Sequence, residues 1–204
     1  MNYIDAVQDV ISQIPTAPDF VITRAFNRTT RRFCDATTAY RYKQTGITVS
    51  GQDTVTLTPP AETAVASVHL VKYGNKKLQP ATDKYLATIG DNRTTGRPDF
   101  FVWREGNDIT LHPAPQDDDE VTVEVALRPS FTATQIPDWF AEKYYETLIA
   151  GTCAEMSRTP DTEFFNPTLF TAMEAYYNAG VVEARKEAYG ADRAVPRKVR
   201  YGGY

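Results

Sequence analysis

The sequence predicts an α+β fold: an antiparallel helical bundle formed by the N- and C-terminal helices, an inserted small antiparallel β-domain, and an extended C-terminal arm. Apolar residues follow a helical period in residues 1–46 and 130–190, whereas they alternate with polar residues across residues 47–129. Neither helical part makes a satisfactory core alone, so packing the two together is the economical arrangement. A fold with the β-domain as core and the helices as an appendage has the same coarse pattern.

Two helices are predicted before the β-domain. Asn2 suits the N-cap of the first helix, Pro15 ends it, and Gly46 closes the second. The apolar face of the first is Ile4, Val7, Ile11 and Ile14, and that of the second is Ile22, Ala25, Phe26, Phe33, Ala36 and Tyr40. The other faces of the second helix carry Arg24, Arg28, Arg31, Arg32 and Arg41.

The middle of the chain reads as strands separated by turns. The strands centre on Val55–Leu57, Val65–Tyr73, Phe101–Trp103, Ile109–Leu111 and Val121–Val125. Residues that favour turns occur at Pro59-Pro60, Gly74-Asn75, Gly90-Asp91-Asn92, Gly106-Asn107 and Pro113 to Asp118. Gly106-Asn107 marks the clearest hairpin, because both residues tolerate positive φ.

Helical spacing returns after the β-domain. Pro137 suits the first position of a helix that ends near Thr159-Pro160. Asn166 and Pro167 form an N-cap and first-position pair for the last helix, and Gly190 is the expected C′ residue.

Composition limits the class of protein. The 204 residues are 42% hydrophobic and 24% charged, with a formal net charge of -4, which is ordinary for a globular chain. Cys34 and Cys153 lie far apart within helical apolar patterns, so we expect two reduced core thiols. No basic segment precedes an apolar run at the N-terminus, and no uninterrupted apolar stretch is long enough to span a bilayer. We expect a soluble protein made in the cytoplasm, with no membrane partner.

Signals for catalysis, cofactors and metals are weak or missing. The chain has only two histidines, His69 in a strand pattern and His112 before Pro113, and no phosphate-loop, dinucleotide or zinc motif. The run from Asp117 to Glu120 offers four carboxylates for a hard cation, but consecutive side chains in a loop point in different directions and are usually solvated. We therefore expect no catalytic residues, no cofactor and no metal.

Cations and aromatic rings suggest partners. The arginines of the second helix suit phosphate contacts or, equally, ion pairs with the acidic helices. The pairs Tyr144-Tyr145, Phe164-Phe165 and Tyr176-Tyr177 place one ring inward and its neighbour outward where helical, and we expect some outward rings to meet another chain. The alternative is that these rings only cover their own core.

Residues 191–204 form a basic, aromatic tail that Pro196, Gly202 and Gly203 prevent from continuing the helix. Such a segment has no core of its own. Two interpretations remain open: an arm that orders against a partner surface, or a frayed, solubilising terminus.

Several short stretches together resemble one protein family. They are Phe33-Cys34-Asp35-Ala36-Thr37-Thr38, Gly96-Arg97-Pro98 before Phe101-Val102-Trp103, Ile109-Thr110-Leu111-His112-Pro113-Ala114-Pro115, Arg128-Pro129, Ile136-Pro137-Asp138-Trp139, Asn166-Pro167 and Tyr201-Gly202-Gly203-Tyr204. In this order they are similar to the head-to-tail adaptors of short-tailed bacteriophages, also called tail tubular protein A or head completion proteins. The stretches cover most of the chain, although relatives often continue beyond the position of Tyr204.

The resemblance implies a non-enzymatic virion protein at the head–tail junction. It implies a homo-oligomeric ring of twelve copies that docks on the portal protein, extends the DNA channel and receives the tail nozzle or another tail protein. Genomic DNA would pass through without sequence-specific binding. The family's C-terminal arm grips the portal, and on this sequence the gripping residues are Arg193, Arg197, Lys198, Arg200, Tyr201 and Tyr204.

Two other classes of function stay open. The first is a sequence-tolerant nucleic-acid-binding module that uses the basic tail and the arginine-rich second helix. The second is a hydrolase built on His112 and a neighbouring carboxylate, which requires a deep pocket in the β-domain.

Overall fold

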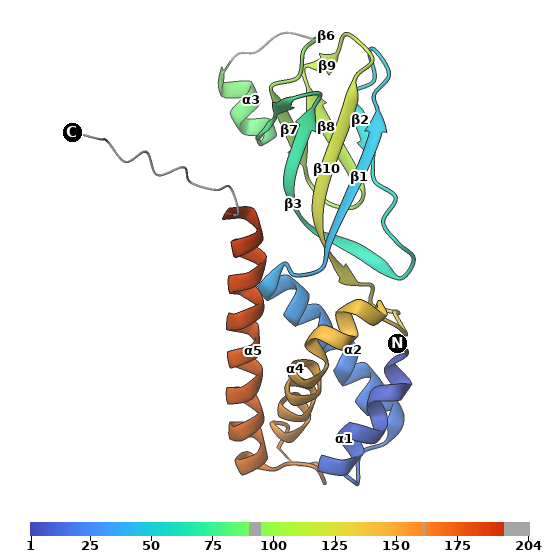
Figure 1. The fold of residues 1–204 in the computed structure, drawn as a ribbon, viewed down its shortest axis with the longest axis vertical. Helices are drawn as coiled ribbons and strands as arrows, with labels where there is room; N and C mark the ends of the chain where they lie inside the picture. The colour runs from blue at the N-terminus through green and yellow to red at the C-terminus, as the bar shows by residue number, and fades with distance from the viewer. Residues whose placement is uncertain (90–94, 161, 194–204) are drawn as a thin grey trace, which may run out of the picture.

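The computed structural model describes residues 1–89, 95–160 and 162–193, with the backbone alone at residues 89 and 191–193. It mixes helices with sheets in an elongated molecule. The strand pairs are antiparallel as predicted, except for two short parallel pairs, Gln79–Pro80 with Phe100–Phe101 and Thr95–Gly96 with Ala114–Pro115. Figure 1 shows most of the helices at one end and the strands at the other, with the chain passing from helices to strands and back.

The first helical segment begins with a 3₁₀ turn, η1 (Tyr3–Ala6), which continues into α1 (Val7–Gln13). Asn2 is the N-cap, as predicted, and its backbone N–H donates to the Asp5 carboxylate at 3.0 Å. The helix ends two residues before Pro15, because proline cannot continue it.

Helix α2 (Asp19–Thr37) is shorter than predicted. The prediction that it runs to Gly46 is wrong: Thr38 adopts the left-handed conformation, with φ of 52°, and ends the helix. Residues Arg41–Ile47 instead form strand β1, which pairs antiparallel with β10 (Glu120–Pro129) from Arg41 opposite Ala126 to Ile47 opposite Glu120. Gly46 therefore lies inside a strand.

Within the described residues, the strands form two four-stranded sheets and one pair. In the first sheet the order is β1-β10-β3-β4, where β3 is Thr63–Tyr73 and β4 is Lys76–Lys77. In the second the order is β2-β8-β7-β5, with β2 (Thr54–Thr56), β8 (Asp108–His112), β7 (Phe100–Trp103) and β5 (Gln79–Pro80). The pair is β6 (Thr95–Gly96) with β9 (Ala114–Pro115).

The predicted hairpin at Gly106-Asn107 is confirmed. Strands β7 and β8 pair antiparallel, with Phe101 opposite Leu111, and Gly106 has φ of 74°. The short helix α3 (Asp83–Ile89) was not predicted, and the predicted turn at Gly90-Asp91-Asn92 lies outside the described residues.

Two long helices follow the strands: α4 (Asp138–Ser157) and α5 (Pro167–Arg193). Pro137 is the N-cap of α4 rather than its first residue. Asn166 caps α5 as predicted, since its side-chain oxygen accepts the Leu169 N–H at 3.0 Å. The predicted end at Gly190 is wrong: Gly190 lacks the positive φ of a C′ glycine, and the helix continues to Arg193.

Helices from the two chain ends pack together, α2 against α4 and α5, and α1 against α4. The contact is close at Gly151, where an added Cβ would lie 2.5 Å from a Tyr177 ring carbon and 2.6 Å from the Thr29 methyl. One apolar cluster joins Phe33 of α2 and Phe140 of α4 to Leu127 of β10, so the helical end and the strands share a core.

A second apolar cluster lies among the helices and includes Val10, Ile22, Cys153 and Met156. Both cysteines are free and buried, as predicted. Burial raises the pKa of the Cys34 thiol well above its usual range and raises that of Cys153 to about 11. These thiols are inert core groups rather than nucleophiles.

Candidate interaction surfaces

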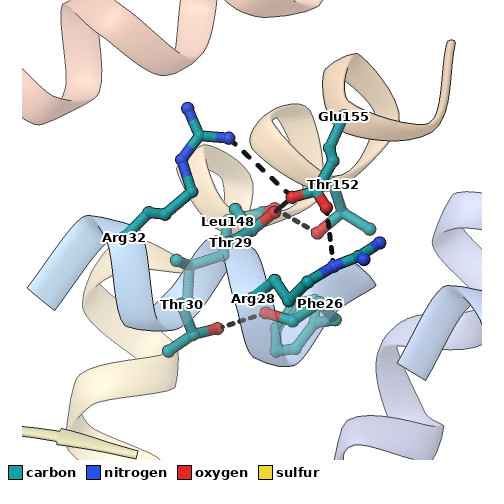
Figure 2. A network of polar contacts seen from close by, with 8 residues as sticks. All are labelled: Phe26, Arg28, Thr29, Thr30, Arg32, Leu148, Thr152 and Glu155. Carbon is teal, nitrogen blue, oxygen red and sulfur yellow. Dashed lines mark hydrogen bonds and ion pairs between the residues drawn. The ribbon is translucent and has the colours of Figure 1, made fainter. Parts of the chain in front are cut away.

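The arginines of α2 form a helical row on its outward face, and the chain already uses two of them. Figure 2 shows Arg28 and Arg32 reaching Glu155 of α4, with nitrogen–oxygen distances of 2.7 and 3.8 Å. The Thr29 hydroxyl donates to the same carboxylate at 3.3 Å. Glu155 is only 13% exposed, so this cluster ties α2 to α4. The structure supports the interpretation that these cations pair with acidic helices.

Other threonines in this region satisfy their hydroxyls within their own helices (Figure 2). Thr30 donates to the Phe26 carbonyl and Thr152 to the Leu148 carbonyl, each at 2.8 Å. Hydroxyls that bond to the preceding turn can be buried without another partner. The Glu155 carboxylate is therefore the ionic contact that joins the two helices in Figure 2.

A groove of about 630 Å³ lies beside this row, between α2, η1 and the segment that leaves β10. We call it the α2 groove. It is lined by Asn2, Tyr3, Ile4, Thr23, Arg24, Asn27, Arg28, Arg31, Phe131, Thr132, Ala133 and Thr134.

The walls of the α2 groove are fixed by hydrogen bonds. The buried Asn27 amide donates to the carbonyls of Ser130 at 3.2 Å and Ala133 at 2.9 Å. Arg31 donates to the Pro129 carbonyl at 3.1 Å, and its guanidinium lies 4.7 Å from the Phe131 ring centroid. These contacts hold the segment after β10 against α2.

The rim of the α2 groove is both cationic and apolar. Arg24 and Arg28 are exposed, and so are Phe131, at 77%, and Ile4, at 55%. Rings and aliphatic chains left in water beside cations are typical of a surface that binds an acidic, partly apolar partner.

An acidic surface lies on η1, α1 and α4. We define the acidic face as Asp5, Asp9, Glu142 and Glu146, all of them exposed. The Tyr145 hydroxyl, between these helices, donates to the Asp9 carboxylate. Desolvation raises the pKa of Tyr145, and the nearby charges of Asp9, Glu146 and Asp5 add to the rise. Three of these carboxylates, Asp5, Asp9 and Glu146, therefore lie near one tyrosine.

The paired aromatic residues divide largely as predicted. Tyr144 and Tyr177 are buried, whereas Tyr176 and Phe165 are exposed. Val182 and Tyr189 of α5 are exposed as well. Whether these rings meet another chain stays a prediction.

The residues predicted to grip a portal are outside the described part of the chain, apart from Arg193, which is the last residue of α5. The helix therefore takes the first three residues of the segment predicted as an arm.

The two histidines belong to different sheets. His69 lies in β3 of the first sheet and His112 in β8 of the second. Carboxylates of the 117–120 run bond to backbone: Asp118 accepts from Ser50 and Asp119 from Glu120, each at 2.7 Å.

Within residues 1–89, 95–160 and 162–193, no group of three or more His, Cys, Asp or Glu side chains is placed to hold a metal ion. None of the helices in that part of the chain has the length and apolar character needed to cross a membrane.

The α2 groove and the acidic face were not predicted. Both depend on contacts between segments far apart in sequence, such as Asn27 with Ala133 and Asp9 with Tyr145. The only local signal was the helical spacing of the α2 arginines. The chain matches no known protein-family model and no curated protein.

Proposed function

We propose that this chain is a structural head-to-tail adaptor of a phage virion. A ring of copies docks on the portal protein, extends the DNA channel and provides the attachment site for the tail nozzle or the next tail component. The observation that supports this best is the order of the fold, in which helices from both ends of the chain pack together and the strands lie between them in sequence. That order is the one the resemblance implies: a helical bundle with an inserted β-domain and a C-terminal arm.

The distribution of exposed apolar groups also supports the proposal. Such groups occur at the α2 groove (Phe131), on the outward side of α5 (Tyr176) and near the end of β1 (Ile47). A ring subunit has neighbours on several sides, and exposed apolar side chains at separate places suit that role. On this proposal the chain is not an enzyme and contacts passing DNA without reading its bases.

The test is the mass of the protein with and without the cognate portal ring, by size exclusion with light scattering. Full-length protein is compared with a version that ends at Arg193, because cutting there leaves α5 intact. We expect the full-length chain to join the portal as a stoichiometric ring and the truncated chain to fail. Absence of portal binding by the full-length chain contradicts the proposal.

A second candidate is the sequence-tolerant nucleic-acid-binding module, and the cations lining the α2 groove favour it. Salt separates the two. Binding to DNA weakens steeply with added salt because counterions are released, whereas portal docking keeps an apolar component. Salt-sensitive retention of DNA, with no portal binding, would favour this candidate over the adaptor.

A further inference from the structure

The α2 groove needs a partner with two properties. Its rim carries the exposed cations of Arg24 and Arg28, of which Arg28 is already paired with Glu155. The exposed side chains of Phe131 and Ile4 lie beside them. Opposite charge on the partner would complement the arginines, and apolar atoms would cover the ring and the isoleucine.

This chain itself carries a surface with both properties. The acidic face lies on η1, α1 and α4, and none of its residues lines the α2 groove. Asp5 borders the groove, because its carboxylate accepts the N–H of the groove residue Asn2. The half-exposed Trp139, the second residue of α4, lies on the same helix as Glu142 and Glu146. The groove and the acidic face share no residue and carry opposite charge.

We propose that the α2 groove docks the acidic face of a second copy of this chain. Two different surfaces then meet at each contact, so every copy keeps one groove and one acidic face for further neighbours, and the assembly grows head to tail into a ring or a filament. This inference rests on the proposed function in one respect only, namely that a portal brings the copies together.

The contacts within the groove favour a protein partner over nucleic acid. Arg28 is paired with Glu155, and Arg31 donates to the Pro129 carbonyl and stacks on Phe131, so two of the groove's cations already have partners. Because exposed ion pairs are individually weak, we expect modest affinity between two free copies and effective assembly only at high local concentration.

Charge reversal tests the proposal without a portal. Sedimentation over a concentration series up to the solubility limit measures self-association of the full-length chain, of Arg24→Glu, of Glu146→Arg and of the double variant. Arg24 and Glu146 are exposed, so the substitutions leave the core intact, and thermal melting checks this. Lys186→Glu, at an exposed cation of α5, is the matched control.

We expect the wild-type chain to associate, each single reversal to weaken association about tenfold, and Lys186→Glu to have little effect. The double variant regains association, because the reversed groove now complements the reversed face. An equimolar mixture of the two single variants also associates, since each copy offers the surface that the other lacks. Added salt weakens the wild-type contact.

Three results would overturn the inference: a wild-type chain that stays monomeric throughout the series, equal effects of Arg24→Glu and Lys186→Glu, or no recovery in the double variant. Loss of DNA binding in Arg24→Glu, with self-association unchanged, would assign the groove to nucleic acid instead. The chain that ends at Arg193 separates this inference from the proposed function, because it should lose portal docking and keep self-association.

Discussion

At the scale of single residues, the helix crossing at Gly151 limits what the packing tolerates. A methyl group there would overlap Tyr177 of α5 and Thr29 of α2. We expect Gly151→Ala to lower the free energy of unfolding by about 1–3 kcal/mol, the usual cost of overpacking, despite alanine's better helix propensity. Urea unfolding measures the change. Gly190→Ala is the control: nothing lies within 4 Å of its added Cβ, so it should be neutral or slightly stabilising.

The buried thiol of Cys153 makes stability depend on alkaline pH. Its folded-state pKa is raised to about 11 by burial, against an ordinary value of 9.0. The unfolded chain therefore loses this proton first as pH rises, and the thiol's contribution to stability is complete below pH 9 and lost between about pH 9 and 11.

We expect wild-type stability to fall over that window by up to about 2–3 kcal/mol more than that of Cys153→Ala. Chemical denaturation at a series of pH values measures the difference between the two proteins. Parallel curves for the two proteins would show that the buried thiol does not titrate in this way.

At the scale of elements, the end of α2 shows why the sequence analysis succeeded in part. Tyr40 fits the helical period and is buried as predicted, yet it lies after the helix has ended. Strand β1 that follows alternates half-buried Tyr42 and Gln44 with exposed Lys43 and Thr45, and so few apolar residues give a weak strand signal. Pairing with β10, a non-local contact, decides the conformation.

The other elements were predictable to the extent that their signals are local. The Asn166 cap and the Gly106 turn depend on neighbouring residues and were predicted correctly. The α2 groove depends on the approach of the 130–134 segment to Asn27 and Arg31, which no local period encodes. The arginines of the groove were identified from the sequence, whereas its exposed apolar side chains were not.

Replacing Thr38, at the end of α2, should stabilise the protein. A β-branched residue with φ of 52° is strained, whereas glycine adopts this conformation without a Cβ clash. We expect Thr38→Gly to raise the free energy of unfolding by about 0.5–1 kcal/mol, less than the strain itself because glycine gains freedom in the unfolded chain. Guanidinium denaturation is the measurement, with Thr38→Val as the control, which should bring no gain. Destabilisation by glycine would show that the threonine side chain contributes more than the strain costs.

At the scale of the whole molecule, the question is whether helices and strands unfold as one unit. The apolar cluster that joins Phe33 and Phe140 to Leu127 predicts that they do, because neither end keeps its core without the other. The two tryptophans lie one at each end: Trp103 in β7, and Trp139 at the start of α4, half of its surface exposed.

Single-tryptophan variants, Trp139→Phe and Trp103→Phe, therefore report on the strands and the helices separately. For each variant, we expect the fluorescence transition in urea to have the same midpoint as the transition followed by far-UV circular dichroism. Comparing the two probes within one variant removes any effect of the substitution on stability. Two separated transitions would mean that the strand region and the helices are independent domains, each stable alone. In that case the shared cluster would be an interface between domains, and Leu127→Ala would shift only one transition. In a single cooperative unit, Leu127→Ala shifts both transitions by the same free energy, because Leu127 is fully buried among residues of both ends.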